Sequence, residues 1–254
     1  MSDSAAPSGK VRYWVIVPAA GIGKRMGGDV PKQYLPLASR RVIEHTLYRL
    51  SLHPLIEEIV VVLSENDSYW DKLHLSWISK PVRTVMGGEE RCHSVLNGLK
   101  SIKERAANND WVLVHDAARP CLRPDDIESL ISECQNEAGG LLGIPVKDTM
   151  KQVDETHKIT ATLKRDHIWH ALTPQMFRYK DLVSALSNVL DRNELVTDEA
   201  MAMEQTGCQP KMVCGHADNI KITHPDDLAL GEFYLEQQQR QGIAVFDDGL
   251  NDGG

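Results

Sequence analysis

Glycine and basic residues gather in one short segment near the start of the chain. Residues 18–26 are PAAGIGKRM, directly after an apolar run, and Pro31-Lys32-Gln33 comes soon after them. Glycines let backbone N–H groups approach an anion closely, and a helix that starts there adds its dipole. Arg25 offers a planar fork of donors and Lys32 a point charge, and both suit phosphate oxygens. The segment therefore predicts a phosphate-binding loop over Ala19–Lys32.

Two common phosphate-binding patterns do not fit this segment. Glycines stand at positions 21 and 23, but Met26 occupies the third glycine position of a dinucleotide fingerprint. The Walker pattern also fails, because no Gly-Lys-Ser/Thr follows at the required distance. A Gly-x-Gly turn alone is more often a plain strand-to-helix connection. The added Arg25, Pro31 and Lys32 favour an anion site.

A carboxylate and an arginine follow another apolar run, in the motif His115-Asp116-Ala117-Ala118-Arg119-Pro120. Open α/β sheets bind ligands at the carboxyl ends of their strands, so Asp116 is placed to meet one. Its carboxylate can accept a hydrogen bond from a sugar hydroxyl or help to hold Mg²⁺ through water. A plain loop or N-cap role is the alternative. Arg119 either contacts the substrate or braces Asp116, and both options stay open.

Apolar runs alternate with helical patterns along most of the chain. Strands are expected at 13–18, 59–63, 111–115, 141–146, 211–214 and 219–222. Helices are expected at 42–50, 90–105, 125–137, 177–190 and 198–206, and a last one from 224. Asp125 and Glu128 have capping-box spacing, and Thr223 stands at the N-cap of the last helix. Buried strands between helices predict one α/β domain over 11–236, a mostly parallel sheet flanked by helices, with flexible tails at 1–10 and 238–254.

Residues 147–166 break this pattern. Polar and apolar residues alternate there around a polar turn at 154–158, which predicts a β-hairpin with one apolar side. Met150, Val153, Ile159, Ala161 and Leu163 form that side. A lone exposed hairpin is marginally stable, so this one needs a surface to pack against.

Composition excludes several classes of function. The chain has 254 residues, 42% of them hydrophobic, and a formal net charge of −8. A surface that tracks nucleic acid needs a basic excess, so nonspecific nucleic-acid binding is not expected. No apolar stretch approaches the ~18 residues of a membrane span. The five cysteines lack a C-x-x-C pair, which favours reduced thiols and a cytoplasmic protein.

Further motifs follow the loop in a fixed order. They are Gly87-Gly88-Glu89-Glu90-Arg91, VHDAARP at 114–120, WHALTPQ at 169–175, Thr197-Asp198-Glu199 and Asp218-Asn219-Ile220-Lys221. From about residue 15 to 234 the set resembles the 2-C-methyl-D-erythritol 4-phosphate cytidylyltransferase family. The resemblance implies a single Rossmann-like nucleotidyltransferase domain with an extended β-hairpin arm. It also implies transfer of CMP from CTP to 2-C-methyl-D-erythritol 4-phosphate, with release of pyrophosphate, in non-mevalonate isoprenoid precursor synthesis.

The resemblance also assigns residues to roles. Arg25 and Lys32 would be catalytic, stabilising negative charge on the transferred phosphoryl group. It places Ala19, Ala20, Gly21, Gly23, Arg25, Lys32, Gly88, Glu89, Arg91, Ser94, Asp116 and Ala117 at the nucleotide, and Arg119, Thr149, Arg165, Thr173, Thr197, Asp218 and Lys221 at the second substrate. Mg²⁺ or another divalent cation would accompany the CTP phosphates. Relatives often carry Asp where this chain has Glu89, and each threonine taken alone is more often structural.

The hairpin of the resembling proteins reaches a second subunit, so a homodimer is expected, with Arg165 available to the partner's site. Two other functions remain open at this point. One is a cytidylyltransferase for ribitol 5-phosphate or a similar polyol phosphate. The other, from a different class, is a nucleotide-binding regulator without catalysis.

Overall fold

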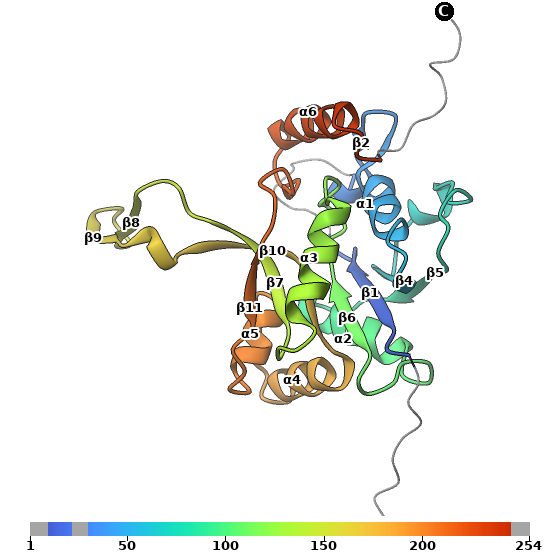
Figure 1. Ribbon diagram of the computed structural model, residues 1–254, viewed down its shortest axis with the longest axis horizontal. Coiled ribbons are helices and arrows are strands. Elements are labelled where there is room, and N and C mark those ends of the chain that lie inside the picture. The colour runs from blue at the N-terminus through green and yellow to red at the C-terminus, as the bar shows by residue number, and fades with distance from the viewer. Residues whose placement is uncertain (1–9, 22–29, 245–254) are drawn as a thin grey trace, which may run out of the picture.

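The computed structural model describes residues 10–21 and 30–244. Its central sheet has seven strands in the order β11-β7-β10-β6-β1-β4-β5 (Figure 1). These strands are β1 (Tyr13–Pro18), β4 (Ile56–Leu63), β5 (Val82–Met86), β6 (Trp111–Val114), β7 (Gly140–Pro145), β10 (Trp169–Arg178) and β11 (Lys211–Cys214). Neighbours among β6, β1, β4 and β5 run parallel, as do β7 and β11, while β10 runs antiparallel to both β6 and β7. The expected mostly parallel α/β sheet is confirmed.

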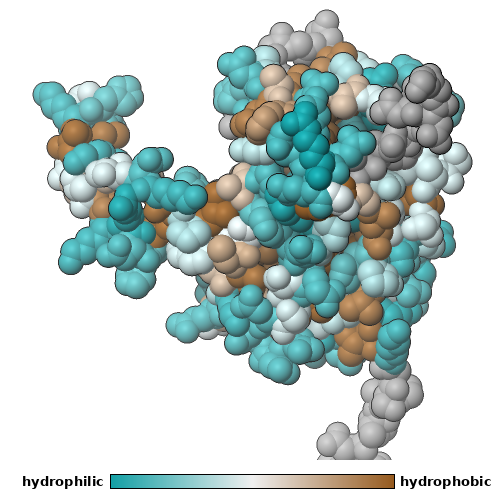
Figure 2. Space-filling view, turned by 45° about the horizontal axis from the view of Figure 1, so that its top comes forward, coloured by the Kyte–Doolittle hydropathy of each residue, from teal (hydrophilic) through white to brown (hydrophobic). Residues whose placement is uncertain are grey.

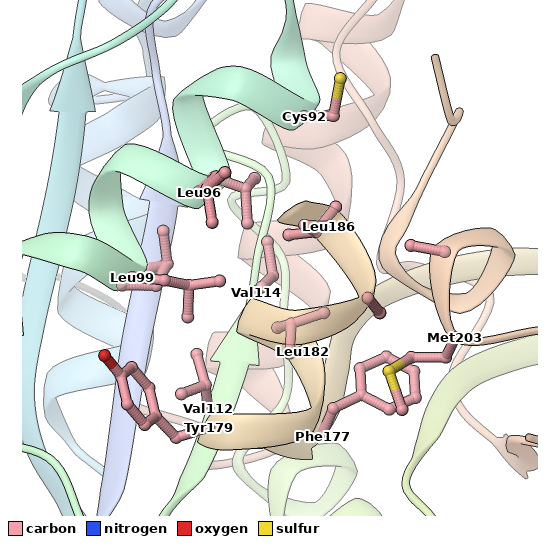
Figure 3. Packing of buried hydrophobic residues seen from close by; sticks show 14 of the residues in the cluster. Cys92, Leu96, Leu99, Val112, Val114, Phe177, Tyr179, Leu182, Leu186 and Met203 are labelled. Carbon is pink, nitrogen blue, oxygen red and sulfur yellow. The ribbon is translucent and has the colours of Figure 1, made fainter. Parts of the chain in front are cut away.

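Helices cover both faces of the sheet, because alternate strand residues point to opposite faces. On one face, Ile16 and Val114 pack with α2 (Arg91–Ser101), α4 (Tyr179–Asp191) and α5 (Glu199–Glu204). Figure 3 shows this layer, with Leu96 and Leu99 meeting Leu182 and Leu186 around Val112 and Val114. On the other face, Val15 and Leu113 pack with α1 (Val42–Ser51) and α3 (Pro124–Cys134).

A third, smaller cluster holds the last helix, α6 (Asp226–Arg240), against the body through Leu37, Val42, Cys121 and Leu235. Inside this contact Gln238 is fully buried and donates to the carbonyl of Cys121 at 2.9 Å. The ordered domain therefore extends past the expected end at 236, at least to the end of α6.

The β-hairpin arm is where the sequence placed it. Strands β8 (Met150–Val153) and β9 (Ile159–Leu163) pair antiparallel, and the arm projects away from the body (Figure 1). The Asp154 carboxylate closes the turn by accepting from the backbone N–H groups of Thr156 and Lys158 at 2.8 and 3.0 Å. The short elements that remain are β2 (Pro36–Leu37), β3 (Arg40–Arg41), and the 3₁₀ turns η2 (Lys32–Tyr34), η3 (Trp70–Lys72) and η4 (Arg165–His167).

Two strands of the central sheet escaped the sequence-based prediction. The edge strand β5 has no regular alternation of polar and apolar residues, since the neighbouring Arg83 and Thr84 are both exposed. Strand β10 contains Pro174, which argues against a central strand, and the register shift between Ala171 and Gln175 accommodates it. Because β10 runs on to Arg178, the expected helix start at 177 was wrong, and α4 begins at Tyr179.

Three local predictions were also wrong. Residues 219–222 form no strand. Helix α3 starts at Pro124 with no capping side chain, and Glu128 bonds His53 at 3.1 Å instead. Thr223 does not cap α6: its backbone N–H and hydroxyl both donate to Asp227, at 2.7 and 2.9 Å.

Candidate active site

One pocket lies at the carboxyl edge of the parallel strands, between the segments that follow β1, β5 and β6. Its volume is about 270 Å³. It is lined by Pro18, Ala19, Ala20, Gly21, Lys32, Gln33, Gly88, Glu89, Glu90, Arg91, Ser94, Asp116, Ala117, Ala118 and Lys221. This is the sheet edge at which open α/β folds bind their ligands.

The backbone after β5 closely approaches the backbone after β1, and this contact shapes the pocket. A Cβ on Gly87 would lie 2.7 Å from the Cβ of Ala20, so no larger residue fits without a shift. The backbone N–H of Gly88 donates to the Ser94 hydroxyl at 3.1 Å, which anchors the turn to α2. On the opposite side, the Gln33 amide donates to the carbonyl of Ala19 at 2.6 Å. The 31–33 segment is thereby attached to the loop after β1.

Asp116 is the centre of a buried charge cluster. Its Oδ2 lies 2.8 Å from Lys221 Nζ and 3.6 Å from Arg119 Nε, and its Oδ1 accepts from Arg91 Nε at 3.3 Å. Burial alone would raise the pKa of Asp116, but Arg91, Lys221 and Arg119 outweigh burial and hold the pKa well below its usual range. The carboxylate is therefore ionised, and it aligns Lys221 at the pocket wall.

Arg119 braces Asp116 from behind the pocket. Its side chain is largely buried, and Nη1 donates to the carbonyl of Asn219 at 2.7 Å. Asn219 in turn donates from its amide to the carbonyl of Thr173 at 2.8 Å. Of the two roles left open for Arg119, the bracing role is the one this geometry supports within the single chain.

A chain of hydrogen bonds fixes the turn that carries Asp116. The carbonyl of Arg119 can only accept, so His115 Nε2, 3.2 Å away, carries the proton. Nδ1 is then an acceptor for the Thr173 hydroxyl at 3.0 Å, and that hydroxyl accepts from the Asp116 backbone N–H at 3.1 Å. Burial lowers the pKa of His115 to about 4. The neutral imidazole thus ties β10 to the end of β6.

Glu199, at the first residue of α5, was part of a quoted motif but had no predicted role. It accepts from Arg91 Nη1 and Nη2 at 2.7 and 3.0 Å and is about 1% exposed. Burial acts to lower the pKa of Arg91, but Glu199 and Asp116 outweigh it and raise the pKa above its ordinary value. Arg91 is therefore a charged bridge between α5 and the end of β6. Glu90 and Gln33 are further pocket residues that had no predicted role.

The predicted nucleotide residues largely come together. Within the described residues, the pocket contains Ala19, Ala20, Gly21, Lys32, Gly88, Glu89, Arg91, Ser94, Asp116 and Ala117 from that set. Gly23 and Arg25 lie outside the described residues.

The predicted second-substrate residues are scattered. Only Lys221 lines the pocket, while Thr173 and Arg119 stand behind it. Asp218 bonds away from the pocket, to Arg123 at 2.6 Å and to Gln238 at 2.8 Å. Thr149, Arg165 and Thr197 are exposed and belong to no part of the pocket in this single chain.

Fold and pocket together define a nucleotidyltransferase: a mostly parallel α/β sheet with basic side chains and close-approaching glycine turns at its carboxyl edge. The model of the 2-C-methyl-D-erythritol 4-phosphate cytidylyltransferase family matches residues 13–237. The chain belongs to this family, which confirms the enzyme class and the reaction expected from the sequence.

Individual relatives agree with this assignment. The 2-C-methyl-D-erythritol 4-phosphate cytidylyltransferase of Hahella chejuensis is 51% identical over 227 residues, 89% of this chain and 94% of the relative. That of Tolumonas auensis is 48% identical, over 89% of this chain and 98% of the relative. A crystal structure of the Francisella tularensis enzyme of the same name superposes with a TM-score of 0.74 at 38% identity, covering 88% of this chain and 99% of that one. A crystal structure of a 4-diphosphocytidyl-2C-methyl-D-erythritol synthase gives 0.77 at 36% identity, over 89% and 99%.

Proposed function

We propose that the pocket holds CTP for transfer of CMP to 2-C-methyl-D-erythritol 4-phosphate. In this proposal the triphosphate lies against residues 19–21 and Lys32, and the base against the turn at Gly88 and Ser94. The observation that carries this arrangement is the ion pair between Asp116 Oδ2 and Lys221 Nζ, which are 2.8 Å apart. This pair lies in the same pocket, at the carboxyl edge of the sheet, as Lys32 and the residues after β1. Phosphoryl transfer needs two anions held in line and charge stabilisation, and little proton transfer. Fixed cations next to a carboxylate that can bind a ribose hydroxyl suit that task.

Arg25 and Lys32 are proposed to stabilise the charge that spreads over the transferred phosphoryl group. Lys32 lines the pocket beside Gln33, which supports the role. The other proposed contacts of the nucleotide are the backbone at Ala19, Ala20 and Gly21.

The second substrate is proposed to bind where a partner subunit's arm meets the pocket. The arm exposes apolar side chains, with Val153 at 46%, Ile159 at 64% and Leu163 at 40%, and Figure 2 shows hydrophobic surface along it between hydrophilic flanks. A hairpin of this kind is marginal unless it packs against something, which supports a homodimer. Thr149 and Arg165, far from the pocket of their own chain, would then serve the partner's pocket.

A divalent cation is proposed to bind together with CTP, where it would supply positive charge at the phosphates. Asp116 is the carboxylate that lines the pocket at the end of β6, and each of its oxygens already accepts from a cationic side chain. A carboxylate oxygen can accept twice, so Asp116 fits a contact with Mg²⁺ through water. Bound there, the ion would neutralise charge on the phosphates. Among residues 10–21 and 30–244 no cluster of three or more His, Cys, Asp or Glu forms a metal site.

A pyrophosphate-release assay tests the reaction. CTP with 2-C-methyl-D-erythritol 4-phosphate should release pyrophosphate, and CTP with ribitol 5-phosphate should release much less. Equal release with both would favour the broader polyol phosphate activity. No release with either, together with CTP binding, would support the non-catalytic regulator.

Subunit mixing tests the shared site. Arg165→Ala and Lys32→Ala chains, each inactive alone, should recover activity when mixed, because a heterodimer contains one site without either change. Mixtures that stay inactive while heterodimers are present would refute the shared site. A cytoplasmic location is also proposed, and it is supported by the five free cysteines.

A further inference from the structure

Glu199 is buried behind the pocket, whereas its partner Arg91 is partly exposed and reaches the pocket. Arg91 lines the cavity, while Glu199 stands behind it at the start of α5 and accepts from both terminal nitrogens of the guanidinium. A bidentate pair of this kind fixes the plane of the guanidinium as well as its position. With the plane fixed in this way, Nε–H donates to Asp116 Oδ1 at 3.3 Å.

Asp116 divides its two oxygens between different cations. Oδ1 accepts from Arg91, and Oδ2 pairs with Lys221 at 2.8 Å. Without Glu199, the terminal nitrogens of Arg91 would lose both of the acceptors that hold them, which is costly for a partly buried guanidinium. The other carboxylate that Arg91 contacts is Asp116, and a bidentate contact with it would compete with Lys221.

We propose that Glu199 is a positioning residue for the cytidylyltransferase reaction: it holds Arg91 so that Asp116 keeps one oxygen for Lys221 at the pocket wall. The network joins the start of α5 to the start of α2 across 108 positions of sequence, and Arg91 links both to Asp116 after β6. Thr197, two residues before Glu199, is a proposed contact of the second substrate. The anchor of Arg91 therefore sits on the same short segment as that contact. The inference rests on CTP binding in this pocket.

The chain offers a matched control in Glu58, on β4. Glu58 is also buried, at 5%, and accepts from two arginines, Arg83 at 3.0 Å and Arg105 at 2.7 Å. It does not line the pocket. The variants Glu199→Gln and Glu58→Gln both remove a buried charge paired with arginine, but only the first changes the support of a pocket residue.

The Michaelis constant for CTP is the quantity to measure, because it does not depend on the fraction of the protein that is folded. If Glu199 acts only through its charge, Glu199→Gln makes the pocket more positive and KM for the anionic CTP falls. If Glu199 positions Arg91 and Asp116, KM rises despite the added positive charge, and we expect kcat/KM to fall about 10- to 100-fold. Glu58→Gln is expected to leave KM unchanged. Wild-type activity shows that the assay and fold are intact, which separates failure of this inference from failure of the proposed function.

A double-mutant cycle completes the test. In an Arg91→Gln background, Glu199→Gln should change KM and kcat/KM by less than about twofold, because the residue it positions is already gone. Glu199→Asp serves if Glu199→Gln does not fold; it keeps the charge but is one methylene too short for both bonds, so KM should still rise. A KM for CTP that stays constant or falls in the single variant, or single effects that multiply in the double variant, would overturn the proposal.

Discussion

Acidification is expected to destabilise this protein through His115, the buried imidazole beside Asp116. Its pKa is about 4 in the folded chain against an ordinary value of 6.5, because burial disfavours the charged ring. Between these two values the unfolded chain binds a proton that the folded chain does not. The stability that neutral His115 contributes is therefore fully present above pH 6.5 and is lost progressively as the pH falls towards 4.

The size of the effect follows from the same two values. At about 1.4 kcal/mol per pH unit, the full difference is about 3 kcal/mol, and about 2 kcal/mol of it is already lost at pH 5 relative to pH 7.5. Other groups titrate as well, so a reference variant is needed. His115→Gln keeps a donor for the Arg119 carbonyl but cannot gain a proton.

Urea unfolding of wild type and His115→Gln at pH 7.5, 6 and 5 measures the effect. The wild type should lose about 2 kcal/mol more than the variant between pH 7.5 and pH 5. The variant itself should be less stable at pH 7.5, because the Thr173 hydroxyl loses its acceptor. Parallel curves, with the same pH dependence in both proteins, would show that His115 is protonated equally in the folded and unfolded states.

Three further changes test other parts of the site. Lys32→Ala should lower kcat by roughly 100-fold or more and raise KM for CTP much less, because it removes charge stabilisation of the transition state. Steady-state kinetics in which KM rises and kcat stays unchanged would contradict this role. Gly87→Ala should cost about 1–3 kcal/mol and weaken CTP binding, because its Cβ would meet Ala20 at 2.7 Å. Calorimetry measures both the loss of stability and the loss of CTP affinity. Gly215→Ala is the control: its Cβ would lie 3.5 Å from the nearest atom, so it should change neither stability nor CTP binding. Gln238→Ala removes the side-chain donor of the Cys121 carbonyl, while Asp218 keeps its pair with Arg123, so thermal unfolding should show a loss of about 1–3 kcal/mol. An unchanged melting temperature would mean that α6 does not brace this segment.

Residue pattern alone was sufficient for the parts of the site that lie next to their strand. The strand at 13–18, residues 19–21 and Asp116 were predicted because each lies in or directly after an apolar run, and the arm was predicted from its alternation of polar and apolar residues. Gly88, Glu89, Arg91 and Ser94 were assigned only by the family resemblance. Parallel strands end at the same edge, so segments that follow them must meet. The catalytic assignment of Arg25 came from the family resemblance, and it stays a prediction, because Arg25 lies outside the described residues.

Tertiary structure decided which side chains face the pocket and which support it. Glu199 pairs with Arg91 across 108 positions of sequence. Thr173 bonds the backbone of Asp116 from β10, a strand that was not predicted because it contains Pro174. Asp218, expected at the substrate, turns instead to Arg123 and Gln238. Local periodicity carries no information about such partners, because a buried charge takes whichever opposite charge the packed elements bring within reach. The glycine and basic residues between positions 19 and 32, and Asp116, were visible in the sequence, whereas the pairing of Asp116 with Lys221 and of Glu199 with Arg91 became visible only in the fold.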